Sequence, residues 1–176
     1  GEKTFAIKEG KLKIEYVPIE GDSLVRSEYL ISSGMLIPVA VLHAVGLMDE
    51  NLFIDWVDTE WCMRANRLGY FLYIDPKVEM NHSIGDSSTY VMGKNIMLHS
   101  DFRNYYKIRN SIYLAMHTPQ TISFKITQIY KTIPYIIFYS WVSPNKLNSF
   151  KLLFRAVFDG VVKNMDKGYF AKKRGV

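Results

Sequence analysis

The sequence contains little cysteine and no long apolar segment. Its 176 residues include one cysteine, Cys62, which excludes an intramolecular disulfide and a zinc cluster built on several cysteines. This composition suits a reducing compartment. No run of about 18 apolar residues occurs, so no ordinary transmembrane helix is encoded. Three common motifs are also missing: Gly-x-Ser-x-Gly, a Walker loop and a dinucleotide-binding fingerprint. A hydrolase triad is therefore unsupported.

Charged residues are distributed unevenly along the chain. The net charge of +5 comes from 22 basic and 17 acidic residues. Residues 1–100 carry 9 Lys/Arg and 14 Asp/Glu, a net charge of −5, whereas residues 101–176 carry 13 Lys/Arg and 3 Asp/Glu, a net charge of +10. Because 48% of the residues are hydrophobic, we expect a packed core. The charge pattern predicts two surfaces of opposite sign with different partners.

The chain reads as a mixed α/β region followed by helices. Polar and apolar residues alternate over 11–16, which predicts a strand, and 28–31 is a second candidate strand. Helices are predicted over 39–45 after Pro38 and over about 58–68 before Gly69. Segment 83–95 is expected to be a loop. Helical periodicity then predicts helices over 100–117, over 123–141 with an interruption or kink at Pro134, and over roughly 144–165.

Acidic side chains gather between residues 46 and 60, among large apolar residues. Asp49 and Glu50 fit a helix cap or a solvated turn. Asp58 and Glu60 lie between tryptophans, where an unpaired carboxylate is costly to bury. A carboxylate kept there is expected to meet a cation, a hydroxyl or a catalytic task. His82, at the end of a predicted strand, fits an ordinary structural histidine as well as a ligand.

Five short motifs occur in order between residues 27 and 85. They are Ser32-Ser33-Gly34, Val45-Gly46-Leu47-Met48-Asp49-Glu50, Phe53-Ile54-Asp55-Trp56-Val57-Asp58-Thr59-Glu60-Trp61-Cys62-Met63-Arg64-Ala65, Gly69-Tyr70 and His82-Ser83-Ile84-Gly85. With this order and spacing, the series resembles the later part of a GT-A glycosyltransferase of family 2, and in particular the bacterial rhamnosyltransferases that build O-antigen and capsular polysaccharide. Segment Arg103-Asn104-Tyr105-Tyr106-Lys107-Ile108-Arg109-Asn110 resembles the helical segment that follows the catalytic domain in that group.

The resemblance implies an α/β fold: the later part of a GT-A (nucleotide-diphospho-sugar transferase) fold followed by a C-terminal helical region. It also implies an inverting transfer, in which a base deprotonates the acceptor hydroxyl. Asp58 occupies the position of the family's catalytic aspartate, although Val57 stands where many relatives have Glu. Glu60 would help to orient the acceptor or the base, and it is also expected to pair with Arg64 at i, i+4. Trp61 either stacks on a sugar or packs in the core.

Two further matches concern the donor. Ser33 and Gly34 match a segment that lines the donor and acceptor pocket, where a small residue permits close backbone approach. His82 matches a histidine that helps some relatives to hold the divalent metal on the donor diphosphate. Imidazole suits Mn²⁺, whereas Mg²⁺ prefers oxygen ligands. The metal would neutralise the diphosphate leaving group. The Asp-x-Asp metal motif of the family has no counterpart in this sequence. The metal is therefore expected only when the upstream half of the enzyme, which carries that motif, is present.

The nucleotide-binding βαβ half of the family has no counterpart in this sequence either. We therefore expect the chain, which begins Gly1-Glu2-Lys3 without an initiator Met, to be the later portion of a longer enzyme, inactive alone. Residues 1–98 would form the acceptor-side part of the catalytic domain, and residues 99–176 a basic helical region. An incomplete sheet exposes an edge, which favours pairing or domain exchange between copies, and hence a homo-oligomer.

The basic region combines Lys and Arg with seven Tyr and one Trp, a composition typical of helices at a membrane interface. A soluble bundle with a solvated basic face, or an oligomer interface, explains the same composition. No recognised nucleic-acid-binding module accompanies it, so no nucleic acid is expected.

The expected function is transfer of a sugar, rhamnose from dTDP-rhamnose, with inversion onto a saccharide or lipid-linked saccharide during cell-surface polysaccharide synthesis. The enzyme would work in the cytoplasm, as a peripheral protein on the inner face of the bacterial plasma membrane where the acceptor is lipid-linked. The alternative is a non-catalytic basic helical module that docks on anionic membrane or on a partner protein.

Overall fold

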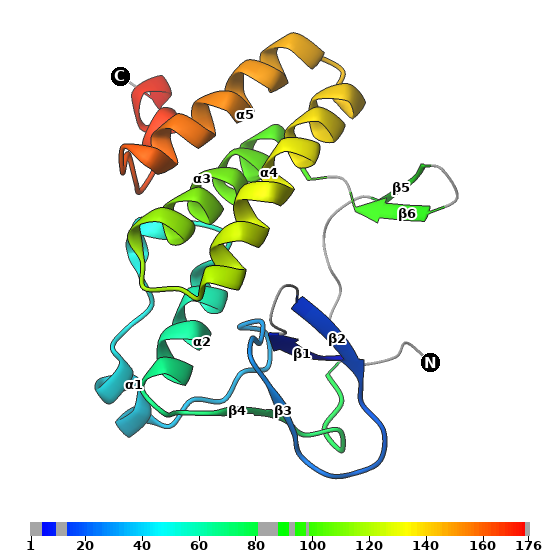
Figure 1. The fold of residues 1–176 in the computed structure, drawn as a ribbon, viewed down its shortest axis with the longest axis vertical. Helices are drawn as coiled ribbons and strands as arrows, with labels where there is room; N and C mark the ends of the chain where they lie inside the picture. The colour runs from blue at the N-terminus through cyan, green and yellow to red at the C-terminus, as the bar shows by residue number, and fades with distance from the viewer. Residues whose placement is uncertain (1–4, 10–13, 81–87, 92–93, 98, 175–176) are drawn as a thin grey trace.

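The computed structural model describes residues 5–9, 14–80, 88–91, 94–97 and 99–174. Three long helices form one body, and the short strands and helices of the first half of the chain lie at its lower end (Figure 1). In chain order the elements are β1 (Phe5–Glu9), β2 (Ile14–Pro18), β3 (Val25–Ser27), α1 (Val39–Val45), η1 (Glu50–Leu52), α2 (Val57–Arg67), β4 (Leu72–Ile74), β5 (Ser88–Val91), β6 (Lys94–Met97), α3 (Asp101–His117), α4 (Ile122–Val142), α5 (Lys146–Val161) and η2 (Gly168–Arg174).

Within the described residues, the strands form three antiparallel pairs: β1 with β2, β3 with β4, and β5 with β6. The predicted strand over 28–31 is wrong, because pairing stops at Ser27. The Ser27 hydroxyl donates to the Tyr29 carbonyl at 2.8 Å, and the Leu30 amide then points to the Cys62 sulfur at 3.4 Å. This segment therefore packs against α2. The predicted loop over 83–95 is also corrected, since β5 and β6 pair there.

The helices before residue 70 match their predictions. Pro38 precedes α1, and Gly46 ends it with a φ of 90°, a conformation in which a side chain would be strained. Helix α2 begins at Val57 and ends at Arg67, and Gly69 follows with a φ of 85°. Asp49 accepts the Asn51 amide at 3.0 Å. It therefore caps η1, which is one of the two roles predicted for it, a helix cap or a solvated turn.

The later helices have clear start signals. Ser100 caps α3 by accepting the Arg103 amide at 3.3 Å, and Thr121 caps α4 by accepting the Phe124 amide at 3.2 Å. Helix α4 continues through Pro134, so of the interruption or kink predicted there the interruption is wrong, and the kink stays a prediction. The proline lies on the exposed side, where its ring meets solvent. Helix α5 stops at Val161, earlier than predicted, because Lys163 adopts a φ of 60°.

Two apolar clusters support these elements. The first joins α1, α2 and β4 to the helical region, since Leu114 of α3 and Phe124 of α4 belong to it together with Trp61 and Cys62. The second joins α3 to α5 and η2 through Tyr105, Tyr106, Leu153 and other side chains. The division at residue 98 stays a prediction, but the first cluster crosses it. The two regions therefore share one core.

Candidate functional site

Asp58 lies in the first turn of α2, at the edge of a cavity of about 550 Å³. Its Oδ2 accepts the Ser32 amide at 3.1 Å, and its Oδ1 accepts the Thr59 amide at 2.8 Å. These two bonds leave further lone pairs on each oxygen. The described residues around the cavity come from three parts of the chain: Ile31, Ser32, Met48, Phe53, Ile54, Asp55, Trp56, Val57, Thr59, Arg103 and Lys107, besides Asp58 itself. The arrangement therefore presents a fixed carboxylate to a space large enough for a sugar.

The loop before Asp58 has an unusual backbone. Phe53, Asp55 and Trp56 have φ values of 62°, 59° and 68°, in the left-handed region that side chains other than glycine seldom adopt. Such a conformation costs on the order of 1–3 kcal/mol per residue and persists only where surrounding contacts impose it. Segment 53–56, called here the acidic loop, is therefore held in place by other parts of the protein.

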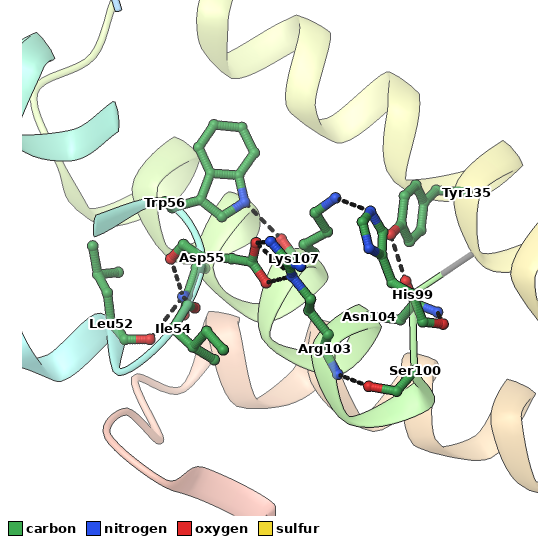
Figure 2. A network of polar contacts seen from close by, with 11 residues as sticks. Leu52, Ile54, Asp55, Trp56, His99, Ser100, Arg103, Asn104, Lys107 and Tyr135 are labelled. Atoms are coloured by element: carbon green, nitrogen blue, oxygen red, sulfur yellow. Dashed lines mark hydrogen bonds and ion pairs between the residues drawn. The ribbon is translucent and has the colours of Figure 1, made fainter. Parts of the chain in front are cut away.

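Helix α3 supplies that support (Figure 2). The Arg103 guanidinium faces the Asp55 carboxylate, with Nε 3.2 Å and 3.1 Å from its two oxygens. The Trp56 indole donates to the Lys107 carbonyl at 3.0 Å. The Asn110 amide donates to the carbonyls of Leu52, Ile54 and Asp55 at 2.9, 2.9 and 3.0 Å. Residues of the basic region thus fix the backbone that leads into Asp58.

Arg109 strengthens the same junction from the interior. Its side chain is 0% exposed, and its Nη2 donates to the Leu52 carbonyl at 3.0 Å. The guanidinium also lies over the Tyr106 ring, 4.8 Å from the centroid. Burial lowers the pKa of this guanidinium from its ordinary value, and the neighbouring Tyr105 opposes the shift. A buried cation held by backbone carbonyls indicates a structural joint between α3 and the segment before the acidic loop.

Ser33 and Gly34 lie beside Asp58 in the chain's tertiary structure. Ser32, whose amide binds the Asp58 carboxylate, also accepts the Met35 amide at 3.1 Å and so closes a turn around them. Gly34 has a φ of 76°, which favours glycine at this position. The structure therefore brings the Ser33-Gly34 segment next to the cavity. Its role in lining a substrate pocket stays a prediction.

Glu60 and Trp61 point away from that cavity. Glu60 is 7% exposed, and its two oxygens accept from Arg64 at 3.0 and 2.9 Å, which confirms the expected i, i+4 pair. Trp61 is 3% exposed and donates to the Gly46 carbonyl at 2.8 Å, so it packs in the core as one of its alternatives expects. Neither is among the described residues around the cavity. Their substrate roles stay predictions, and both side chains help to fix α2.

The predicted metal ligand, His82, lies outside the described residues. Among the residues that the structure does describe, no group of three or more His, Cys, Asp or Glu side chains could hold a metal ion. Near Asp58, the Asp55 carboxylate is already occupied by Arg103. The described residues alone therefore do not fit a divalent cation.

Asp55, Arg103 and Asn110 had no predicted role in the site. Asp55 lies in the motif over 53–65, and the other two lie in segment 103–110. The two segments are about fifty residues apart in the sequence, and only the tertiary structure shows that they are in contact. A signal was present in the type of residue: an Arg and an Asn at a spacing of seven place both side chains on one face of a helix.

The chain is similar to a glycosyltransferase. That relative carries the name dTDP-rhamnosyl transferase RfbF, comes from Shigella flexneri, and is 35% identical over 155 residues. The match covers 88% of this chain and 52% of the relative, so the chain spans about half of the relative's length. No family model matches the chain. No solved structure matches it either.

Proposed function

We propose that this chain is the acceptor-side part of a glycosyltransferase that moves a rhamnosyl group from dTDP-rhamnose to a saccharide hydroxyl. The observation that carries the proposal is the Asp58 carboxylate, fixed by two backbone amides at the edge of a sugar-sized cavity. The similarity to a rhamnosyl transferase supports the class of reaction. A family 2 GT-A fold, and a metal bound by His82 together with an upstream half, belong to the same proposal.

In the proposed reaction Asp58 acts as the general base. The acceptor oxygen forms a bond to the anomeric carbon, and the bond between that carbon and the diphosphate oxygen breaks with inversion. The hydroxyl proton passes to a carboxylate oxygen of Asp58. The hydrogen bonds from the Ser32 and Thr59 amides stop the carboxylate from rotating, so the remaining lone pairs of its oxygens keep one direction. The acceptor is a saccharide, free or lipid-linked, in cell-surface polysaccharide synthesis.

Replacement of Asp58 by asparagine tests this role in the enzyme extended by its upstream half. The substitution keeps the size of the side chain and removes the base, so transfer of radiolabelled rhamnose should fall about 10²–10⁴-fold. Asp22→Asn is the control, because Asp22 is exposed and is not among the described residues around the cavity. Normal transfer by the Asp58→Asn variant would show that Asp58 is not the base.

A second candidate function is docking on an anionic membrane, and the surface of α4 favours it. The side chains that face outward from α4 are mainly apolar and 51–76% exposed: Ile122, Ile126, Ile129, Tyr130, Ile133, Ile137 and Trp141. The side chains it buries are largely polar: Ser123, Thr127, Gln128, Thr132 and Ser140. This pattern is the reverse of an ordinary surface helix. An exposed apolar face of this extent indicates that α4 contacts another protein or the apolar part of a membrane.

The positive charge of α4 and α5 favours an anionic bilayer as the environment that contacts this apolar face. Between Asp101 and Asp159 the sequence has no acidic residue, and α4 and α5 carry Lys125, Lys131, Lys146, Lys151 and Arg155. Asp159 itself is 0% exposed and accepts from Tyr105 and Arg155. A second copy of this face would meet it with like charge, whereas anionic lipid attracts each basic side chain by about 1 kcal/mol. No described helix is long and apolar enough to cross a bilayer.

Sedimentation with vesicles tests this candidate. The chain should sediment with vesicles of equal parts phosphatidylglycerol and phosphatidylcholine, and not with phosphatidylcholine alone. The double variant Ile133→Ser, Ile137→Ser should bind the anionic vesicles at least about tenfold more weakly, because two exposed isoleucines no longer contact lipid. Leu36→Ser, which changes an exposed apolar residue outside α4 and α5, is the control. Absence of sedimentation, or a concentration-dependent dimer that the double variant abolishes, would exclude membrane docking.

A further inference from the structure

Three phenylalanine rings form a row between the cavity at Asp58 and a cavity of about 570 Å³ beside α5, called here the α5 cavity. Phe53 is among the described residues around the cavity at Asp58, and Phe170 is among those around the α5 cavity. Phe102 lies between them, with its ring centroid 6.4 Å from that of Phe53 and 4.9 Å from that of Phe170. This aromatic row therefore links the two cavities.

The aromatic row is both exposed and fixed in place. Phe53 and Phe102 are 43% and 39% exposed, so both rings forgo part of the stabilisation that burial would give. The buried Tyr106 ring contacts all three members of the row, at centroid distances of 5.1, 4.9 and 5.9 Å. Phe53 also has a φ of 62°, and backbone strain of this kind is concentrated at functional sites. Exposed rings that are held so firmly indicate a surface on which a ligand packs.

The α5 cavity lies between α5, the first turn of α3 and η2, and much of its lining is polar. The side chains of Asn145, Asn148 and Lys151 line it, and no residue that the structure describes forms a hydrogen bond or ion pair with them. Asp101 also lines it, with one oxygen accepting the Ser149 hydroxyl at 2.5 Å and the other left for a ligand. Carboxamides donate and accept, an ammonium donates, and a carboxylate accepts. This mixture suits sugar hydroxyl groups, which donate and accept at once.

The charges described around the α5 cavity cancel one another. Arg155 lines the cavity, but its Nε donates to the Asp159 carboxylate at 2.9 Å, so this cation already has an anionic partner. The other charged groups of the described lining are the Lys151 ammonium and the Asp101 carboxylate, one of each sign. A lining with balanced charge, polar groups of both kinds and an aromatic ring favours a neutral polyhydroxylated ligand over an anion or a cation.

We propose that the aromatic row and the α5 cavity bind a segment of a neutral oligosaccharide, the part of the acceptor that extends away from the hydroxyl at Asp58. The role as an acceptor subsite rests on the proposed function, whereas the binding of neutral saccharide is a property of this chain by itself. The apolar faces of successive sugars pack on Phe53 and Phe102. Hydroxyl groups farther along the saccharide bind the carboxamides, the ammonium and the carboxylate of the α5 cavity.

An array of immobilised oligosaccharides tests the proposal with the fluorescently labelled 176-residue chain. The array carries neutral chains of rhamnose and of N-acetylglucosamine, and matched chains that contain glucuronate, from disaccharides to hexasaccharides. The protein should retain neutral members, and glucuronate should not strengthen binding. Among the retained neutral chains, hexasaccharides should bind about tenfold more tightly than disaccharides, because only the longer chains reach from the aromatic row into the α5 cavity.

Two sets of substitutions locate the binding. The double variant Asn148→Ala, Lys151→Met should bind neutral hexasaccharides about tenfold more weakly, because it removes hydrogen-bond donors from the α5 cavity. Lys146→Met is the matched control, because Lys146 is also exposed on α5 and is not among the described residues that line the cavity. Phe102→Ala should abolish the gain with length, since it interrupts the aromatic row. Circular dichroism verifies folding, and the exposed positions of the double variant give a protein that is expected to fold in any case.

The outcomes separate this inference from the function proposed for Asp58. Asp58→Asn should keep the gain with length, because Asp58 belongs neither to the aromatic row nor to the described lining of the α5 cavity. If that variant of the longer enzyme transfers rhamnose normally while the array result holds, the base is wrong and the saccharide site stands. No retained neutral oligosaccharide, tighter binding of the glucuronate chains, no gain with length, or equal binding by the double variant and Lys146→Met would overturn the site, whatever the transfer assay shows.

Discussion

Replacement of Asn110 by alanine should release the acidic loop from α3. Asn110 is 0% exposed, and its two amide hydrogens are shared among the carbonyls of Leu52, Ile54 and Asp55, at 2.9, 2.9 and 3.0 Å. These bonds hold a segment in which three residues adopt positive φ. Alanine removes the donors and leaves the loop without its main backbone support.

The expected loss of stability follows from the carbonyls that lose their partner. The Leu52 carbonyl keeps a bond from Arg109 Nη2 at 3.0 Å. The loss therefore falls on the carbonyls of Ile54 and Asp55, and on Arg109 Nε, which donates to the Asn110 side-chain oxygen at 2.9 Å. An unsatisfied buried polar group costs about 1–3 kcal/mol. Both carbonyls are only partly buried, and water can reach them after the loop relaxes. We therefore expect the free energy of unfolding to fall by about 2–3 kcal/mol, a large share of the roughly 5–15 kcal/mol typical of a domain.

Urea denaturation of three variants decides the matter. Asn110→Ala should lose about 2–3 kcal/mol. Asn110→Asp should lose stability as well, because its carboxylate keeps Arg109 Nε as a partner but has no hydrogens to donate to the carbonyl oxygens. Asn148→Ala changes an exposed asparagine of α5 and should stay within about 0.5 kcal/mol. A loss below about 1 kcal/mol for Asn110→Ala, or an Asn110→Asp variant as stable as the unchanged protein, would refute the role of Asn110 as the clamp of this loop.

Two further substitutions probe the packing on either side of that clamp. Gly160→Ala should lower the free energy of unfolding by about 2–3 kcal/mol in thermal unfolding, because its Cβ would lie 2.6 Å from the Arg109 carbonyl and 3.0 Å from the Ile112 Cβ; a midpoint equal to that of Asn148→Ala would contradict the close contact of α3 and α5. Burial raises the pKa of the Cys62 thiol to about 11, whereas an unfolded cysteine titrates near 8.5, so the unfolded state binds fewer protons between these values and stability falls as the pH rises. This fall, about 2–3 kcal/mol in urea denaturation by about pH 11, should be missing in Cys62→Ala, and parallel curves for the two proteins would contradict it.

Most helices could be predicted because their signals are local. Pro38 and Gly46 mark the two ends of α1, and the Ser100 hydroxyl caps α3 within three residues. The error at 28–31 has a different origin. The apolar residues there pack on α2 through Cys62, which is 32 positions away, and no local pattern contains that contact.

The acidic loop could not be predicted for the same reason. Left-handed residues are usually glycine or asparagine, but Phe53, Asp55 and Trp56 carry large or charged side chains. Their conformation depends on Arg103 and Asn110, which follow about fifty residues later. The polarity of α4 was also hidden, because helical periodicity shows that a helix has two faces and does not say which face lies inside. Only the tertiary structure, in which Gln128 and Thr132 line a cavity between α3 and α4, shows which face of α4 lies inside.

The acidic and basic halves of the chain meet at α3. Residues 1–100 carry a net charge of −5 and residues 101–176 a net charge of +10, which by itself suggests two independent surfaces. The Asp55–Arg103 ion pair joins the two, with the carboxylate only 9% exposed. Because Arg103, Lys107 and Asn110 hold the backbone before Asp58, a change in α3 should alter the position of that carboxylate without touching it. The helix that begins the basic region is therefore part of the proposed catalytic site, and the same helix lines both the space at Asp58 and the cavity of about 420 Å³ between α3 and α4.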